Sequence, residues 1–144
     1  MIRDQTIIAG NALPWRDKVA FSELMLSWEL RSWHLAVDSK HPYFFDRRIP
    51  DIAGYLTTCD IPIPKHIEKA ISLFRYARTV FIAPPWKGIF VQDAERKQSY
   101  RESVKTFDAM VECYNRYKYE LIELPRTRVE ERAEFILSSL DDRI

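Results

Sequence analysis

The chain has 144 residues, of which 47% are hydrophobic and 13% aromatic, enough apolar mass for the core of one domain. Its 22 basic and 21 acidic side chains leave a formal net charge of +1, which excludes the strong field that holds nucleic acid or an anionic membrane. No apolar run approaches the roughly 20 residues of a membrane helix, and the two cysteines stand apart without metal-ligand spacing, so we expect a compact cytoplasmic protein.

The first half of the chain predicts helices around one short strand. Residues 1–16 carry turn-forming pairs and predict a loop. From 17 to 38, two apolar stripes at helical spacing predict a long helix that is buried on more than one side. The continuous apolar run 43–45, followed by Asp46, is typical of a buried strand in a parallel sheet. Further helices are expected at 51–58, after a proline, and at 65–76.

The second half predicts two strands and two helices. A buried strand is expected at 79–82, where two prolines close it. Ser99 and Glu102 form a capping-box pattern that opens a long helix. A strand is then expected at 119–124, and a second capping-box pattern at 127–130 precedes the last helix.

Strands that alternate with helices in this order predict an α/β fold, a layered parallel sheet with flanking helices. Ligands of such sheets bind at the carboxyl ends of the strands. We therefore expect Asp46-Arg47, the turn at 84–86 and Pro125-Arg126 to lie along one rim, where the chemistry is to be sought. Trp15 and Trp86, in loops near that rim, are candidates for stacking on a nucleobase, with ordinary packing as the alternative.

Glycine placement excludes one kind of site within these residues. A phosphate-binding loop of the type GxxxxGK[ST] needs backbone N–H groups that close around phosphates without Cβ obstruction. The three glycines, Gly10, Gly54 and Gly88, are not followed by glycine five residues later, and no Gly-Lys pair exists. The 144 residues therefore contain no phosphate loop of this type.

Several strings give the chain a family resemblance that covers essentially its whole length. They are IRDQ (2–5), NALPWR (11–16), FFDRRIPD (44–51), FIAPPW (81–86), QDAERKQ (92–98) and ELIELP (120–125). With these residues the chain resembles the small ATP-binding P-loop proteins, ATPase/kinase-like, that are grouped as an AAA domain family. Taken together, the DRxxPD and APPW…DAERKQ strings are fairly specific.

The resemblance implies a P-loop NTPase (kinase-like) fold that lacks its first strands. In the family, a strand, the phosphate loop, its helix and a second strand precede the stretch seen here, so 1–144 is expected to form a single partial, amino-terminally truncated domain. The strands at 43–46 and 79–82 would then flank the place of the absent first strand. Relatives usually have glycine at the positions of Arg48 and Lys118, where a side chain is strained if φ is positive.

The resemblance also implies the site residues and cofactors, ATP and Mg²⁺. Asp46 and Arg47 would be catalytic. Asp46 would hold the metal through water or orient the phosphoryl acceptor, and Arg47 would bind the acceptor or a phosphate. Arg96 and Lys97 would close over the nucleotide as a lid, and Arg126 would also contact it. The residue types alone allow plainer readings, in which Asp46-Arg47 forms an ion pair with Asp51 or interacts with a helix terminus, and 95–97 is a solvated turn.

The function implied by resemblance is ATP hydrolysis or phosphoryl transfer to a small acceptor. Without a phosphate loop, we expect these residues to bind ATP weakly or not at all and to be inactive alone. The alternative is a non-enzymatic interaction module that binds a second copy or a partner chain through an open sheet edge or through the tyrosine-bearing helix expected after Ser99. A third reading is a gene remnant, or a reading frame that begins upstream.

Overall fold

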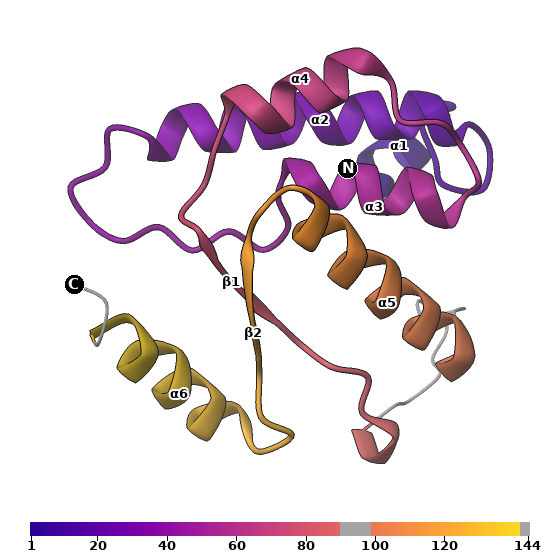
Figure 1. Cartoon of the computed structure of the whole chain (residues 1–144). Helices are drawn as coiled ribbons and strands as arrows, with labels where there is room; N and C mark the ends of the chain where they lie inside the picture. Colours follow the sequence, from indigo (N-terminus) through magenta and orange to yellow (C-terminus); the bar gives the residue numbers. More distant parts are fainter. Residues whose placement is uncertain (90–98, 142–144) are drawn as a thin grey trace. The chain divides into compact units, whose positions relative to one another are not determined.

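The computed structural model describes residues 1–89 and 99–141 and comprises two compact units, Met1–Tyr76 and Ala77–Ile144 (Figure 1). The first unit contains helices α1 (Ile2–Ile7), α2 (Lys18–Ala36), α3 (Ile49–Thr58) and α4 (Lys65–Leu73). The second contains strands β1 (Thr79–Ile82) and β2 (Glu120–Glu123), the short 3₁₀ helix η1 (Lys87–Ile89), and helices α5 (Tyr100–Arg116) and α6 (Val129–Asp141). Within these ranges, no helix combines the length and the hydropathy of a membrane span.

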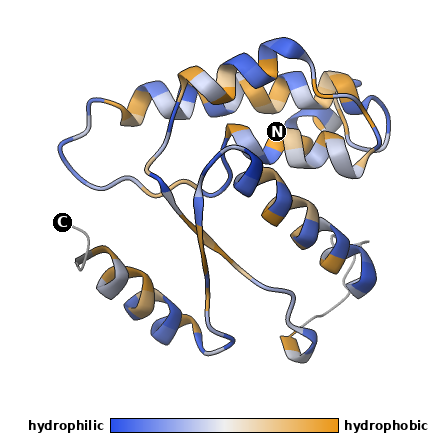
Figure 2. Cartoon of the chain, viewed as in Figure 1, coloured by the Kyte–Doolittle hydropathy of each residue, from blue (hydrophilic) through white to orange (hydrophobic). Residues whose placement is uncertain are grey.

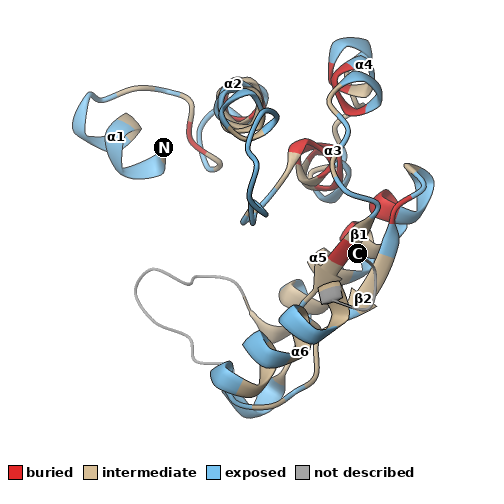
Figure 3. Cartoon of the chain, turned by 90° about the vertical axis from the view of Figure 1, so that its left-hand side faces the viewer, coloured by how far each residue is buried: buried red, intermediate tan, exposed pale blue. Residues whose placement is uncertain are grey.

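The core of the first unit is built around α3, which contacts α2 on one side and α4 on the other. The Ile52 and Leu56 side chains of α3 and Ile67 of α4 are each at most 1% exposed. Figure 3 shows this buried strip along α3 and α4. Pro50 lies in the first turn of α3, where its missing N–H leaves no helical hydrogen bond unmade. The predicted helices at 51–58 and 65–76 are thus confirmed, although α4 ends at Leu73.

Helix α2 forms where the sequence predicts it, but its expected burial on more than one side is wrong. The Asp17 side chain caps it by accepting a hydrogen bond from the Ala20 N–H at 2.9 Å. Phe21 and Leu26 are buried, whereas Trp28 is 44% exposed. Val37, at the end of the other apolar stripe, is 49% exposed, so both stripes stay partly in solvent. The helix packs against α3 and also contacts α4, where the His66 ring lies 2.8 Å from the Glu23 carboxylate.

The amino-terminal segment is not simply the predicted loop, since it contains the helix α1. The amino group of Met1 forms an ion pair with Asp4 at 3.1 Å, and this pair supports the first turn. The Gln5 side-chain carbonyl accepts a hydrogen bond from the Ala12 N–H at 3.3 Å and tethers the helix to the turn that follows. The contact between Gln5 and Ala12 forms only once the turn has folded. The turn-forming residues of the sequence therefore predicted a loop and not the helix before it.

The expected strand at 43–46 is wrong, because this segment forms no regular element and pairs with no strand in the described structure. Tyr43 and Phe44 are more than half exposed. The Phe45 ring lies 5.0 Å from the ring of Tyr43 and 4.9 Å from the ring of Tyr76. The aromatic run therefore packs ring against ring rather than into a sheet.

The second unit contains a parallel two-stranded sheet, so a mixed α/β architecture is confirmed in this coarse form. β1 pairs with β2, with Thr79 opposite Glu120 and Ile82 opposite Glu123. Helix α5, which follows β1 in the chain, packs on β2 and alternates apolar with polar residues (Figure 2). The core of this unit consists of Val80, Met110, Cys113, Tyr114 and Tyr119. The additional layers of the expected P-loop fold are not seen among the described residues.

The two positions at which the resemblance implies glycine behave differently. Lys118, directly after α5, has a φ of 65°, and the Tyr119 N–H that follows it bonds to the Tyr114 carbonyl at 3.0 Å. Lys118 thus ends the helix with its own backbone in the left-handed conformation, which glycine adopts most readily. Arg48 is extended, with a φ of −151°, and the positive φ of 82° falls on Arg47 instead.

Candidate functional site

The carboxyl ends of β1 and β2 are joined by a side chain that the sequence singled out. The Arg126 Nε donates to the Pro85 carbonyl at 3.3 Å, and its Nη1 lies 3.7 Å from the Glu123 carboxylate. Because parallel strands end on the same side of a sheet, the turns after them meet there. The expectation that 84–86 and 125–126 share one rim is therefore confirmed within the second unit.

Trp86 and the short helix η1 form the next part of this rim. The Ile89 N–H bonds to the Trp86 carbonyl at 3.3 Å, which closes the turn. A Cβ atom on Gly88 would lie 3.0 Å from the indole nitrogen of Trp86, so the glycine allows the ring to lie close against the backbone. Lys87 is exposed beside it. The rim thus combines an aromatic ring with cationic side chains.

Asp46 and Arg47 lie in the first unit, in the loop before α3. The Arg47 Nη1 forms an ion pair with Asp51 at 3.4 Å, which is the plainer reading that the residue types allowed. Asp51 also accepts a hydrogen bond from the Arg48 N–H at 2.9 Å at the start of α3. The Asp46 side chain is exposed. Its catalytic role, and its expected place on the same rim as Arg126, stay predictions.

Glu29 of α2 joins this charged group and was missed from the sequence. The pKa of Glu29 is raised from 4.5 to about 7, mainly by partial burial and further by the negative charges of Asp51 and Asp46, while Arg47 acts in the opposite direction. Its place between Trp28 and Leu30 was a usable signal, because a carboxylate inside an apolar stretch is prone to burial. The group can therefore exchange a proton near neutral pH.

Arg48 completes the charged group at the start of α3. Its guanidinium carbon lies 5.3 Å from the centre of the Tyr76 ring, a cation–π contact. Its Nη1 is buried without a hydrogen-bond acceptor among the described residues. The Arg48 guanidinium therefore packs on the face of the Tyr76 ring. The hydroxyl of Tyr76 accepts a hydrogen bond from the Ile49 N–H at 3.4 Å.

The side chains near Asp46 do not form a complete metal-binding site. Among residues 1–89 and 99–141, no three His, Cys, Asp or Glu side chains stand close enough to hold an ion together. Asp51 is already engaged by Arg47 and by the Arg48 N–H. Asp46 by itself fits at most one position of a Mg²⁺ shell, whose other ligands would be water and substrate phosphates.

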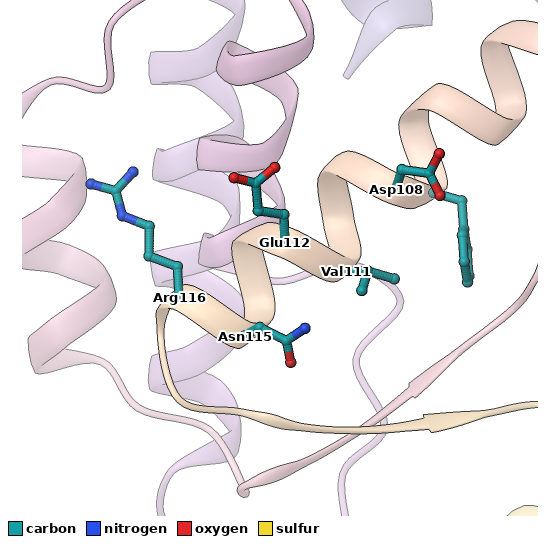
Figure 4. A pocket seen from close by; sticks show the side chains of 6 residues that line it. Asp108, Val111, Glu112, Asn115 and Arg116 are labelled. Atoms are coloured by element: carbon teal, nitrogen blue, oxygen red, sulfur yellow. The ribbon is translucent and has the colours of Figure 1, made fainter.

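Arg96 and Lys97, the expected lid residues, lie outside the described residues. An open hollow of about 610 Å³ runs along α5 (Figure 4), and the residues that line it are Phe107, Asp108, Val111, Glu112, Asn115 and Arg116. All of them belong to one helix, and none is a nucleophile beside a base. This hollow is therefore a poorer candidate than the rim at the strand ends.

Comparisons with known proteins give one match. A family model described as an AAA domain matches residues 1–132, which is most of the chain. No curated protein and no solved structure matches the chain. The matched range includes Asp46, Arg47 and Arg126.

Proposed function

The chain belongs to the AAA domain family, and on this basis we propose that it is a nucleotide-binding domain of the ATPase/kinase-like class. The observation that carries the proposal is the hydrogen bond between Arg126 and Pro85 at the carboxyl ends of β1 and β2. Ligands of parallel sheets bind at these ends. A nucleotide would meet an ordered rim there, with the Trp86 ring and the cations Lys87 and Arg126.

The nucleotide fits this rim only in part. An aromatic ring and a guanidinium suit a base and a phosphate charge. However, the 144 residues contain no GxxxxGK[ST] string, so no glycine-rich loop surrounds the β- and γ-phosphates. Removal of one donor from a catalytic oxyanion site already costs about 2.7–4 kcal/mol. We therefore expect weak binding of MgATP and no hydrolysis by this polypeptide alone.

A binding measurement with matched variants tests the proposal. Ligand-observed saturation-transfer NMR with MgATP is recorded for wild type, Arg126→Ala and the control Arg128→Ala. Arg128 is 80% exposed and pairs with Glu131 in the first turn of α6, so its loss should leave nucleotide binding unchanged. We expect a signal for wild type and Arg128→Ala and a weaker one for Arg126→Ala. No signal for wild type would overturn the proposal.

Catalysis is tested separately through Asp46. We expect release of phosphate from MgATP by wild type to equal the blank, because the phosphates lack most of their donors. Turnover that disappears in Asp46→Ala would contradict this expectation and assign Asp46 the catalytic role implied by the family. Turnover that persists in Asp46→Ala would indicate a contaminating ATPase, and purification would remove it.

A second candidate function is an interaction module that uses the edge of β1. Among the described strands, β1 pairs with β2 alone. The residues of β1, Thr-Val-Phe-Ile, carry no charge, whereas β2 begins with Glu120 and ends with Glu123. Charged ends protect a strand from pairing with another chain, and β1 lacks this protection on its own residues. Sedimentation equilibrium tests it, since a strict monomer would contradict pairing with a second copy.

A further inference from the structure

We propose that the indole ring of Trp86 is the surface on which the base of the nucleotide stacks. This rests on the proposed function and deepens it, because it names the part of the ligand that the chain recognises. The ligand class is then a nucleoside or nucleotide rather than a bare polyphosphate. The residues that surround this ring all belong to the second unit.

The position of Trp86 is fixed from two directions. On its amino-terminal side, the Pro85 carbonyl accepts the hydrogen bond from the Arg126 Nε, so the turn is tied to the end of β2. On its carboxyl-terminal side, the Ile89 N–H bonds to the Trp86 carbonyl and closes η1. A turn whose backbone is held in this way loses little freedom when a ligand binds, which favours recognition.

The ring itself is close to the backbone and lacks partners among the described residues. A Cβ on Gly88 would approach the indole nitrogen to 3.0 Å, so the glycine leaves room for one edge of the ring. Trp33 shows the usual alternative, since its Nε1 donates to the Arg75 carbonyl and its ring contacts Phe74 at 5.2 Å. Within the described part of the chain, the half-buried Trp86 has neither kind of contact.

The charges around the ring suit the rest of a nucleotide. Lys87 is exposed next to the ring, and Arg126 is 51% exposed at the neighbouring strand end. Glu123 offsets part of the Arg126 charge, at 3.7 Å. An aromatic side chain can stack on any of the bases. Replacing such a side chain by alanine weakens binding by about 5- to 150-fold. The base therefore supplies most of the affinity in a site without a phosphate loop.

The test compares ligands with and without a base. Wild type, Trp86→Leu, Trp86→Phe and the control Trp15→Leu are titrated with MgATP, adenosine and magnesium tripolyphosphate. Trp15, the other tryptophan that the sequence made a candidate for stacking, is 65% exposed in a loop of the first unit, so this variant removes the alternative indole. Saturation-transfer NMR reports the adenine protons of the first two ligands, and tripolyphosphate is followed as a competitor of MgATP. Circular dichroism verifies that each variant folds.

We expect Trp86→Leu to weaken MgATP and adenosine by about 5-fold or more, Trp86→Phe to retain most of the binding, and Trp15→Leu to match wild type. Tripolyphosphate should compete poorly with MgATP. MgATP binding that Trp86→Leu leaves within twofold of wild type would overturn the inference while the proposed function stands. No binding of any nucleotide by wild type would overturn both.

A second measurement needs no variant. In wild type saturated with adenosine, we expect intermolecular nuclear Overhauser effects between the Trp86 indole protons and adenine H2 or H8. Their presence supports the stacking even if Trp86→Leu does not fold. Effects confined to protons of other residues would overturn it.

Discussion

The Nε of Arg126 and the carbonyl oxygen of Pro85 lie 3.3 Å apart, and this hydrogen bond ties the turn after β1 to the end of β2. The two residues are 41 positions apart in the chain. Arg126 therefore holds the backbone of the rim in addition to any contact with a ligand. A loss of nucleotide binding in Arg126→Ala combines these two effects, which is why the stacking test on Trp86 is needed beside it.

The pH dependence of stability should report Glu29. Because its pKa is raised to about 7 in the folded state from 4.5, the folded chain holds more protons than the unfolded chain between these values. The contribution of Glu29 is thus fully present below pH 4.5 and is lost as pH rises through about 7. Glu29→Gln should raise the free energy of unfolding by about 1 kcal/mol at pH 8, after allowance for solvent screening, and change it little at pH 4.5.

Chemical denaturation between pH 4.5 and 8 checks this prediction. The matched control is Glu134→Gln, an exposed residue of α6, which should keep the pH profile of wild type. A Glu29→Gln variant whose profile runs parallel to that of wild type would contradict the assignment of the titration to Glu29.

Lys118→Gly should stabilise the chain. The lysine has a φ of 65° after α5, and glycine adopts this conformation without the Cβ penalty. We expect a gain of about 0.5–1 kcal/mol in the free energy of unfolding, measured by denaturant titration. Lys105→Gly, inside α5, is the opposite control and should cost about 1 kcal/mol. A loss of stability in Lys118→Gly would show that the lysine side chain has another role.

Ser99→Ala should weaken the start of α5. The Ser99 hydroxyl accepts a hydrogen bond from the Glu102 N–H at 3.3 Å, and the Glu102 carboxylate accepts one from the Ser99 N–H at 2.6 Å. Loss of such a cap costs about 1 kcal/mol. Ser138→Ala, an exposed serine within α6, should have little effect on thermal unfolding followed by circular dichroism. Equal melting temperatures for Ser99→Ala and wild type would argue against the cap.

Leu56→Ala should strongly destabilise the first unit. Leu56 of α3 is 0% exposed, and the cavity left by a buried leucine costs about 2–5 kcal/mol. Leu73→Ala, at the end of α4, removes a side chain that is 61% exposed and should cost less than about 0.5 kcal/mol. Denaturant unfolding of the two variants checks the prediction, and similar losses in both would contradict the position of the core.

The sequence revealed best the elements whose signals are local. The Ser99–Glu102 capping box predicts the start of α5, and both of its hydrogen bonds are present. The run at 79–82 predicts β1, since two prolines end it. These patterns involve neighbours in the chain, so they survive without knowledge of the tertiary structure.

The misses arise where distant residues decide. A short apolar run such as 43–45 is compatible with a strand and with an aromatic cluster. The contact between Phe45 and the Tyr76 ring, thirty-one positions further along the chain, decides in favour of the cluster. In the same way, the raised pKa of Glu29 depends on Asp46 and Asp51, which only folding brings near it. The rim of Arg126 and Pro85 was predictable because parallel strands must end on the same side.

Backbone amide mapping tests the nucleotide site most directly. ¹⁵N-labelled chain is titrated with MgATP, and the shift of each amide signal is followed by two-dimensional NMR. We predict saturable shifts at Trp86, Lys87, Arg126 and Thr127, with unchanged signals along the Asp108–Arg116 face of α5. Shifts that leave these four amides unchanged, or no shifts at the highest MgATP concentration, would contradict nucleotide binding at the ends of β1 and β2.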